Sequence, residues 1–250
     1  MSSIQLIGLE GIPEVKPGDQ LASYIVAATR QSGVTIAQGD VLVVAQKIIS
    51  KAEGRLVHLS DTEPSAFAKT LAAACQRDPR FIELVLRESR RIVRMSDRVI
   101  ITETHHGLIC ANAGIDHSNV AGEAVVSLLP TDPDLSARRL RAELKQLLDT
   151  DVAIVITDTF GRPWREGLTN VAIGLAGINP LSDLRNQRDN HGKLLRATVL
   201  ATADELASAA GLIMRKTIGV PVVLVTGCGY EAGEHRASEL LRAKEHDLFR

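Results

Sequence analysis

Short, continuous apolar runs recur along the chain, and each is bounded by polar or turn-forming residues. The runs occupy residues 40–45, 98–102, 152–157 and 220–226, and β-branched side chains are frequent in them. An uninterrupted apolar run of this length is typical of a strand that is covered on both faces. The pattern therefore predicts a buried strand at each of these places.

Two stretches between these runs have helical periodicity instead. In the first, Asp132 is placed to cap a helix that has Pro133 in its first turn. The apolar face of this helix is formed by Leu140, Leu144, Leu147 and Leu148. In the second, Thr202 and Glu205 form a predicted capping box, and an apolar face continues from there to Ile213.

The spacing of these elements argues against a regular alternation of strands and helices. The strands are unevenly separated, and residues 162–193 are rich in Gly, Asn, Asp and Arg without clear periodicity. A doubly wound sheet would show a more regular order. We therefore predict an α+β fold with mixed sheets and packed helices, in a single domain over residues 1–250 that has no separable linker and leaves room for a division into two lobes.

Composition excludes some classes of partner. Among 250 residues, 29 basic side chains nearly balance 30 acidic ones, and aromatic residues make up 3%. Such a chain has no strong attraction to nucleic acid or to an anionic membrane, and it has few rings on which bases could stack. We expect a small-molecule ligand, with no nucleic acid and no membrane as partner. Because the start of the chain lacks signal-peptide features and no apolar run has the length of a bilayer span, the expected location is cytoplasmic.

One apolar run ends abruptly in polar side chains. Residues 154–162 are IVITDTFGR, so Asp158 and Thr159 follow directly on a predicted strand. Mg²⁺ and Mn²⁺ prefer oxygen ligands and commonly take one or two carboxylates, while water and substrate phosphates complete the shell. Asp158 and Thr159 meet that demand. The alternative, that Asp158 caps the following turn, is equally compatible with this segment.

A second isolated acid follows a stretch of small residues. Residues 110–119 are CANAGIDHSN, and small side chains let the backbone approach a ligand closely. Asp116 is placed to complete a metal site with Asp158, and Asn119 to contact a nucleotide base or sugar. Asp and Asn are also common turn formers, and the segment by itself favours that simpler interpretation.

Two lysines follow the first predicted strand. Lys47 and Lys51 are four residues apart, so a helical turn after the strand would place both ammonium groups on one face, where they could neutralise phosphate. Two solvated lysines at the start of a helix are an equally good interpretation.

Several common nucleotide-binding and catalytic motifs are missing from the sequence. GxxxxGK[ST], HExxH and GxSxG are absent, and residues 227–233 miss the GxGxxG spacing by one residue. His105 and His106 fall in a predicted strand, where neighbours point to opposite faces, so we do not expect them to bind one metal. Arginines spaced as on a helix predict a solvated basic stripe: Arg87, Arg90, Arg91 and Arg94.

Five longer motifs together resemble one family, that of the coenzyme F420-0:L-glutamate ligases. The motifs, in this order over nearly the whole chain, are GIPEVKPGD, QKIISKAEG, ANAGIDHSN, ITDTFGRPWREG and ADELASAAGL. The resemblance implies the family's γ-glutamyl ligase fold and a homodimer with a substrate groove between subunits. It also implies GTP-dependent, GDP-forming synthesis of an amide between L-glutamate and the lactyl carboxylate of coenzyme F420-0, followed in many members by γ-linked additions.

The resemblance also assigns roles to residues of this sequence. It implies that Mg²⁺ or Mn²⁺ is bound by Asp116, Asp158 and Thr159. It places the nucleotide along Ile12, Pro13, Glu14 and Val15, with Gln46, Lys51 and Asn119 also in contact. Asp116, Asp158 and Lys51 are the expected catalytic residues.

A carboxylate is a poor acyl donor, so the expected route transfers the γ-phosphoryl group to it and forms an acyl phosphate that the glutamate amine attacks. Residue type and position make Arg162, Arg165 and Arg185 candidates for binding substrate carboxylates or the phosphodiester.

Two positions depart from the family pattern. Leu168 stands where GQTN is expected to have its polar Gln, and Asn186 stands where many members have Gly after Arg. We interpret both as tuning of acceptor choice or chain length. Two other functions stay open at this point: a non-catalytic nucleotide- or deazaflavin-binding protein, and a metal-dependent phosphatase acting on small phosphate esters.

Overall fold

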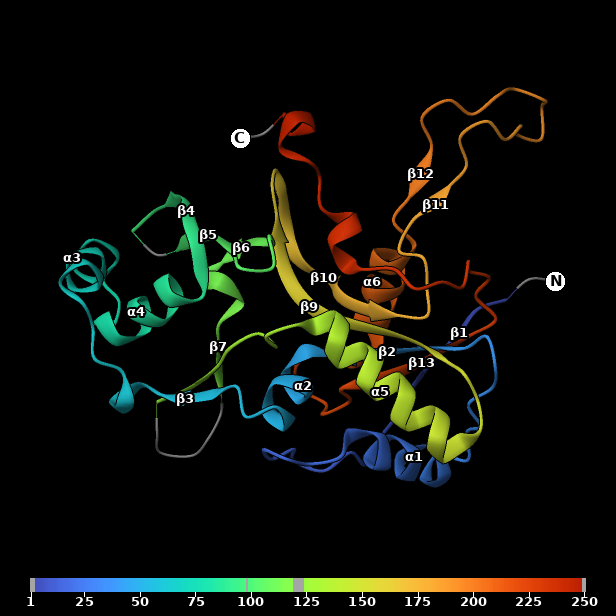
Figure 1. Cartoon of the computed structure of the whole chain (residues 1–250), viewed down its shortest axis with the longest axis horizontal. Coiled ribbons are helices and arrows are strands. Elements are labelled where there is room, and N and C mark those ends of the chain that lie inside the picture. Colours follow the sequence, from blue (N-terminus) through green and yellow to red (C-terminus); the bar gives the residue numbers. More distant parts are fainter. Residues whose placement is uncertain (1–2, 98, 119–123, 249–250) are drawn as a thin grey trace.

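The centre of the protein is a five-stranded sheet (Figure 1). The structure is a computed structural model that describes residues 3–97, 99–118 and 124–248. The strand order is β1-β13-β2-β9-β10, and every neighbouring pair is antiparallel except β2 and β9. The bounds are β1 Gln5–Gly8, β2 Val41–Ala45, β9 Ala153–Arg162, β10 Arg165–Ala176 and β13 Val222–Thr226.

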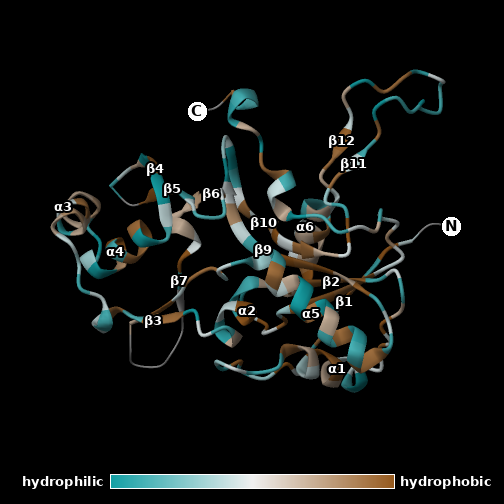
Figure 2. Cartoon of the chain, viewed as in Figure 1, coloured by the Kyte–Doolittle hydropathy of each residue, from teal (hydrophilic) through white to brown (hydrophobic). Residues whose placement is uncertain are grey.

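Helices cover both faces of this sheet, because the side chains of its central strands are apolar on both sides. Leu42, Val44 and Ile156 pack on one face with helices α1 (Leu21–Gln31), α2 (Gln46–Ala52) and α5 (Pro133–Leu148). Val43 and Val155 pack on the other face with α6 (Thr202–Met214). Figure 2 shows the central strands as a predominantly hydrophobic layer. This two-sided burial is what the uninterrupted apolar runs predicted.

A second region, with its own apolar core, lies to one side of the sheet in Figure 1. Its core joins side chains such as Ile82, Ile100 and Val126. Two three-stranded sheets, ordered β3-β8-β7 and β4-β5-β6, pack here with two helices. The bounds are β3 Leu56–His58, α3 Ala66–Cys75, α4 Pro79–Arg87, β4 Ser89–Met95, β5 Ile100–Thr104, β6 Ile109–Ala111, β7 Asp116–Ser118 and β8 Val125–Ser127.

The remaining elements are short. Strands β11 (Ser182–Asp183) and β12 (Val199–Leu200) begin a ribbon that projects from the body (Figure 1). Short 3₁₀ turns are η1 Leu59–Asp61, η2 Asn112–Gly114, η3 Ala237–Leu240 and η4 Lys244–His246. None of the described helices is long and apolar enough to cross a membrane.

Strand β10 lies at the edge of the central sheet, where backbone groups lack a neighbouring strand. Carboxylates from two helices accept hydrogen bonds from backbone N–H groups of this edge. Asp204 accepts a hydrogen bond from the Ala172 backbone N–H at 2.9 Å, and Asp134 accepts one from the Leu175 N–H at 2.9 Å. A bulge in β10 between Ala172 and Gly174 accompanies these contacts.

The predicted α+β fold with mixed sheets is confirmed, and the four apolar runs all contain strands. Several local predictions were wrong. Helix α4 ends at Arg87, and the other arginines of the predicted helical stripe lie on strand β4. His105 and His106 follow β5 in a turn instead of lying within a strand. Thr202 is the first residue of α6, whose N-cap is Ala201 without a side-chain cap, and part of the segment predicted as irregular forms β10.

Candidate active site

The polar end of the central sheet lies where β2 and β9 finish. These parallel neighbours share their last register pair at Ala45 and Thr157. Helix α2 begins directly after β2, and β9 continues through Asp158 and Thr159, so both chain segments leave the buried layer at the same edge. A cavity of about 520 Å³ opens there. Its volume lies within the range of small-molecule binding sites.

Residues far apart in the sequence meet in this cavity. They come from the loop before α1, from α2, the start of β7, the end of β9, β10 and the loop after α6. The lining includes most residues predicted for nucleotide and metal binding: Ile12, Pro13, Glu14, Val15, Gln46, Lys51, Asp116, Asp158 and Thr159. Asn119 lies outside the described residues. The predicted roles require this proximity, and the roles themselves stay predictions.

Asp158 has an unusual electrostatic environment at the end of β9. The pKa of its carboxyl group is raised to about 7, chiefly by burial and also by the negative charge of Asp116. A hydrogen bond that the Thr159 backbone N–H donates to Asp158 Oδ1 at 2.7 Å opposes this effect, as do the charges of Lys216 and Lys47. The two acids are therefore close enough to repel each other, and a bound cation would relieve that repulsion.

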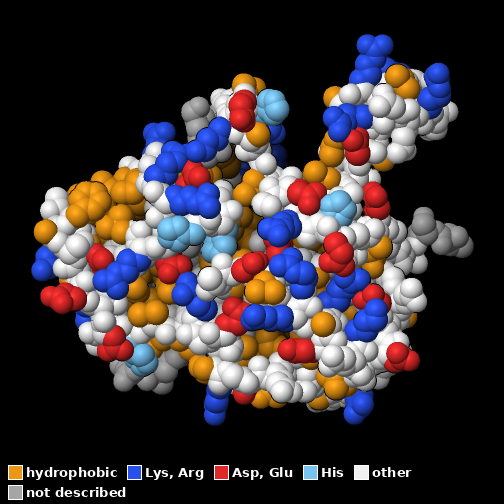
Figure 3. Space-filling model, in the orientation of Figure 1, with side chains coloured by type: hydrophobic (Ala, Val, Ile, Leu, Met, Phe, Trp, Pro, Cys, Tyr) orange, Lys and Arg blue, Asp and Glu red, His pale blue; other side chains and the backbone are white. Residues whose placement is uncertain are grey.

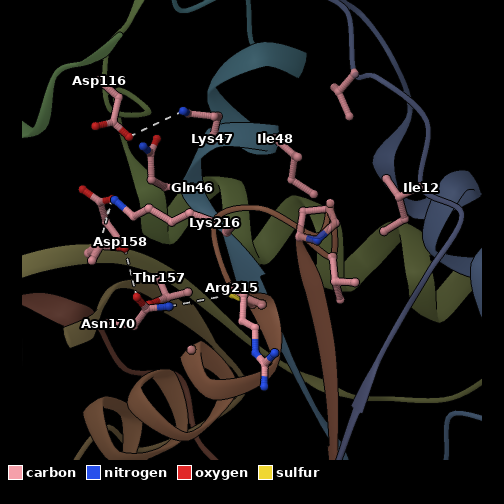
Figure 4. Close-up of a pocket in the computed structure, with 18 of the residues that line it drawn as sticks. Ile12, Gln46, Lys47, Ile48, Asp116, Thr157, Asp158, Asn170, Arg215 and Lys216 are labelled. Carbon is pink, nitrogen blue, oxygen red and sulfur yellow. Dashed lines mark hydrogen bonds and ion pairs between the residues drawn. The ribbon is translucent and has the colours of Figure 1, made fainter. Parts of the chain in front are cut away.

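Asp116 faces the same space from the start of β7. Its Oδ2 lies 3.7 Å from Lys47 Nζ, and both side chains are well exposed to solvent. Figure 4 shows Asp116 and Lys47 pointing toward each other, with Asp158 and Lys216 adjacent on the same side of the cavity. Because exposed ion pairs are weak, Lys47 can exchange Asp116 for a ligand group at little cost.

The donor set fits Mg²⁺ or Mn²⁺. Asp116 and Asp158 supply carboxylates, and the Thr159 hydroxyl, which donates to Asn170 Oδ1 at 3.0 Å, keeps its lone pairs available. Within residues 3–97, 99–118 and 124–248, no three His, Cys, Asp or Glu side chains gather as a metal site. A cation here would therefore complete its shell with hydroxyl, water or phosphate oxygens, as these hard ions commonly do.

Lys51 and Gln46 form another part of the wall, on α2. The Lys51 ammonium, whose side chain is 13% exposed, pairs with the Glu14 carboxylate, whose side chain is 75% exposed. Gln46 is fully buried, and its Oε1 accepts a hydrogen bond from the Ser50 hydroxyl at 2.8 Å. The helical turn predicted for residues 47–51 is present, and both lysines line the cavity. Lys51 is thus held at the wall by a carboxylate that is free to move into solvent.

The sequence matches the sequence profile of one protein family over residues 11–227, which is most of the chain. That family is F420-0:Gamma-glutamyl ligase. The chain belongs to this family. It is similar to the coenzyme F420:L-glutamate ligase of Methanopyrus kandleri, with 44% identity over 258 residues that cover 100% of both chains.

Two further relatives carry the same name. The ligase of Methanothermobacter thermautotrophicus is 42% identical over 250 residues, which cover 99% of each chain. That of Methanocaldococcus jannaschii is 38% identical over 249 residues, 99% of this chain and 97% of the relative. Membership in the F420-0:gamma-glutamyl ligase family therefore rests on full-length similarity.

In this member of the ligase family, the cavity also contains side chains that the sequence patterns did not single out. Arg215 and Lys216 follow the end of α6 and line the cavity, although no local motif marks them. Asn170 orients Thr159 from the neighbouring strand. Recognising β10 as the partner of β9 would have placed Asn170 opposite Thr159, because they are register partners.

The positions that depart from the ligase-family pattern differ in setting. Leu168 lines the cavity and is 63% exposed, so it presents an apolar side chain to whatever binds. Asn186 lies on the ribbon with φ 68°, a left-handed conformation that favours Gly and that Asn tolerates best among other residues. The change from Gly to Asn at this position is therefore compatible with an unchanged backbone.

The three arginines proposed as substrate contacts lie outside the lining of this cavity. Arg162 and Arg165 flank the turn of the β9–β10 hairpin, and the Arg162 guanidinium donates to the Glu166 carbonyl at 3.1 Å. Arg185 is held on the ribbon by the Asp183 carboxylate, and this pairing lowers the pKa of Asp183 to about 2. Within this chain they are not placed to contact a ligand in the cavity.

Proposed function

We propose that the chain is a GTP-dependent, GDP-forming ligase that joins L-glutamate to the lactyl carboxylate of coenzyme F420-0 and can then add a γ-linked glutamate. One observation carries this proposal: two closely placed carboxylates share a cavity with four basic side chains, Lys47, Lys51, Arg215 and Lys216. Such a site can hold a polyphosphate together with a divalent cation. The names of the relatives supply the coenzyme and glutamate as substrates.

The two ends of the cavity suit the two ends of a nucleotide. Ile12 and Ile48 lie away from the acidic side (Figure 4), and Val220 adds a further apolar side chain to the lining. An apolar wall of this kind accommodates a flat ring, while the basic side chains accommodate phosphates. The choice of GTP over ATP rests on the family resemblance.

Activation of the acceptor carboxylate requires a phosphoryl donor. A lactyl carboxylate oxygen attacks the γ-phosphorus, the bond to the bridging oxygen breaks, and GDP leaves with its electron pair. The glutamate nitrogen then attacks the acyl carbon, the bond to the phosphate oxygen breaks, and phosphate leaves while the amine proton passes to solvent. Both steps bring anions together, so positive charge around the reacting groups lowers both barriers.

The side chains of the cavity have separate tasks in this route. Lys51 and Lys216 bind phosphate oxygens, and Lys47 offsets the charge of the incoming carboxylate. Asp116, Asp158 and Thr159 hold Mg²⁺ or Mn²⁺, which when bound supplies further charge neutralisation and alignment. Asn170 keeps the Thr159 hydroxyl oriented toward the cavity through their 3.0 Å hydrogen bond.

We extend the proposal to a homodimer, which the family resemblance implies. Trp164 and Leu168, near the turn of the β9–β10 hairpin, are 78% and 63% exposed. Large exposed apolar side chains on a projecting hairpin are typical of an interaction surface. Light scattering coupled to gel filtration measures the mass directly, and a monomer at working concentration would contradict this part of the proposal.

The reaction is tested by mass spectrometry of coenzyme F420-0 after incubation with the protein, GTP, Mg²⁺ or Mn²⁺ and L-glutamate, each omitted in turn. We expect a gain of one glutamate residue or more that requires every component, accompanied by GDP. Release of phosphate without a mass gain would indicate a phosphatase. Nucleotide binding with neither signal would indicate a binding protein, and either result would contradict the proposal.

A further inference from the structure

A second cavity, of about 240 Å³, lies beside the β9–β10 hairpin. Its walls include Leu108 just before β6, Ile109 of β6, Phe160 of β9, Val171 of β10 and Leu241 near the end of the chain. The volume is about half that of the first cavity, too small for a nucleotide and sufficient for an amino acid. None of the residues predicted for nucleotide or metal binding lines it.

The apolar walls carry one acidic and one basic side chain, Asp204 and Arg242. Asp204 Oδ1 accepts from the Ala172 N–H at 2.9 Å, which leaves Oδ2 available, and burial raises the pKa of this carboxyl group. Arg242 is exposed at the rim. Among the described residues, neither side chain is part of an ion pair that joins it to another side chain. A carboxylate and a guanidinium on otherwise apolar walls complement the ammonium and carboxylate of an amino acid.

The second cavity lies next to the proposed reaction site. Val171, in its wall, is the register partner of Asp158 across the hairpin. Phe160, also in its wall, lies two residues after Asp158 on the same strand, and alternate residues of a strand share a face. The first cavity contains Asp158 and the second contains its cross-strand partner, so the two cavities are neighbours on the hairpin.

We propose that this second cavity binds the α-amino-acid acceptor, L-glutamate in the reaction proposed above, and that the inference rests on that proposed function. Asp204 receives the ammonium group and Arg242 a carboxylate, while Phe160 and Val171 contact the methylene stem. The acceptor amine is thereby held beside Asp158, on the face of the hairpin that Asp158 shares with Phe160 and Val171. Asp204 and Arg242 are binding residues in this scheme and take no part in phosphoryl transfer.

The test compares Asp204→Asn and Arg242→Gln with matched controls. Asn keeps an oxygen that accepts the hydrogen bond from the Ala172 N–H, and Arg242 is exposed, so both variants are expected to fold.

The controls change similar groups outside both cavities. Asp134→Asn changes the other carboxylate that accepts a hydrogen bond from the β10 edge, and Lys244→Gln removes a nearby positive charge. We expect each cavity variant to raise the KM for L-glutamate about tenfold or more, with the KM for GTP unchanged, because each loses a charge-assisted contact. The controls should leave both constants unchanged.

A separate binding measurement keeps this inference distinct from the proposed reaction. Equilibrium dialysis with labelled L-glutamate requires no turnover. Saturable binding to the native chain that is weakened in both cavity variants supports the inference, even if the native chain forms no amide and the proposed function fails. If the native chain binds no glutamate, if the variants bind it as the native chain does, or if the variants raise the KM for GTP instead, the inference is overturned.

Discussion

Basic side chains gather in two regions of this molecule, and their surroundings differ. In the cavity at the end of β2 and β9, Lys51 and Lys216 face a hollow that also holds two acids. On strand β4, Arg90, Arg91 and Arg94 lie on an exposed edge, and Figure 3 shows basic side chains over this strand.

The shape of the surface around these basic groups differs between the two regions. Arg91 is already bound to the buried Glu103 at 2.7 Å on the neighbouring strand, and Arg90 and Arg94 lie on an open surface where solvent screens their charges. In the cavity, the same kind of charge lies in a concave space beside acids that repel each other. We therefore propose the concave cavity, and not the exposed strand β4, as the site for an anion.

The largest effect in this comparison should come from Asp158. We expect Asp158→Asn to lower amide formation more than about 100-fold with the fold retained, because it removes a proposed ligand of the cation. Product mass and GDP release measure the loss, and thermal unfolding checks the fold. Asp183→Asn, a carboxylate paired on the exposed ribbon, is the control and should stay near native activity. Near-normal turnover in Asp158→Asn would contradict the proposed role of Asp158 as a metal ligand.

Lys51 and Glu14 should change nucleotide binding in opposite directions. Lys51→Met loses a partner for phosphate, so the Kd for GDP should rise about tenfold. Glu14→Gln loses the carboxylate that competes for Lys51, so the Kd should fall by about twofold, the modest effect of an exposed ion pair. Calorimetric titration of GDP, with guanosine as the phosphate-free control, measures both. Weaker binding in Glu14→Gln would show that the nucleotide is bound through the Glu14 carboxylate, and would contradict a competing role for that carboxylate.

The pH dependence of stability should reveal the environment of Asp158. Its folded pKa is raised to about 7, so between pH of about 4 and 7 the folded state holds a proton that the unfolded chain has lost. The contribution of this group to stability is therefore complete at low pH and is lost as pH rises through that window. We expect the Tm of the metal-free protein to fall with pH by a few degrees more in the native chain than in Asp158→Asn. Parallel curves would contradict the raised pKa.

The smallest effect should come from the arginines of β4. Replacing Arg90, Arg91 and Arg94 together by Gln should change amide formation and the KM for GTP by less than about twofold, since exposed charges contribute little. Steady-state kinetics measures both quantities. A tenfold loss would show that this exposed strand takes part in substrate binding, and the contrast between the two basic regions would disappear.

Local sequence patterns predicted the parts of the site that lie at the ends of apolar runs. Asp158 and Thr159 follow the buried apolar part of β9, and Lys47 follows β2, so a change from apolar to polar residues marked them directly. Arg215 and Lys216 carry no such mark, because they reach the cavity only through the packing of α6 against the sheet. Tertiary structure alone determines that contribution.

Irregular strands account for most of the remaining errors. The arginines after α4 are spaced as on a helix, but β4 contains register shifts that disturb the alternation by which a strand is recognised. Strand β10 has similar shifts on both sides of Asn170, which concealed both the strand and this residue. The predicted cap at Thr202 failed because Ala201 takes the N-cap position.

The central claim is that this cavity transfers a phosphoryl group to a carboxylate, and oxygen-18 labelling tests it most directly. Coenzyme F420-0 labelled in its lactyl carboxylate is incubated with GTP, Mg²⁺ and L-glutamate, and the released phosphate is analysed by mass spectrometry. An acyl phosphate route leaves one carboxylate oxygen in the phosphate for every amide formed. We therefore expect one labelled oxygen in each phosphate released. Amide formation with unlabelled phosphate would contradict the account.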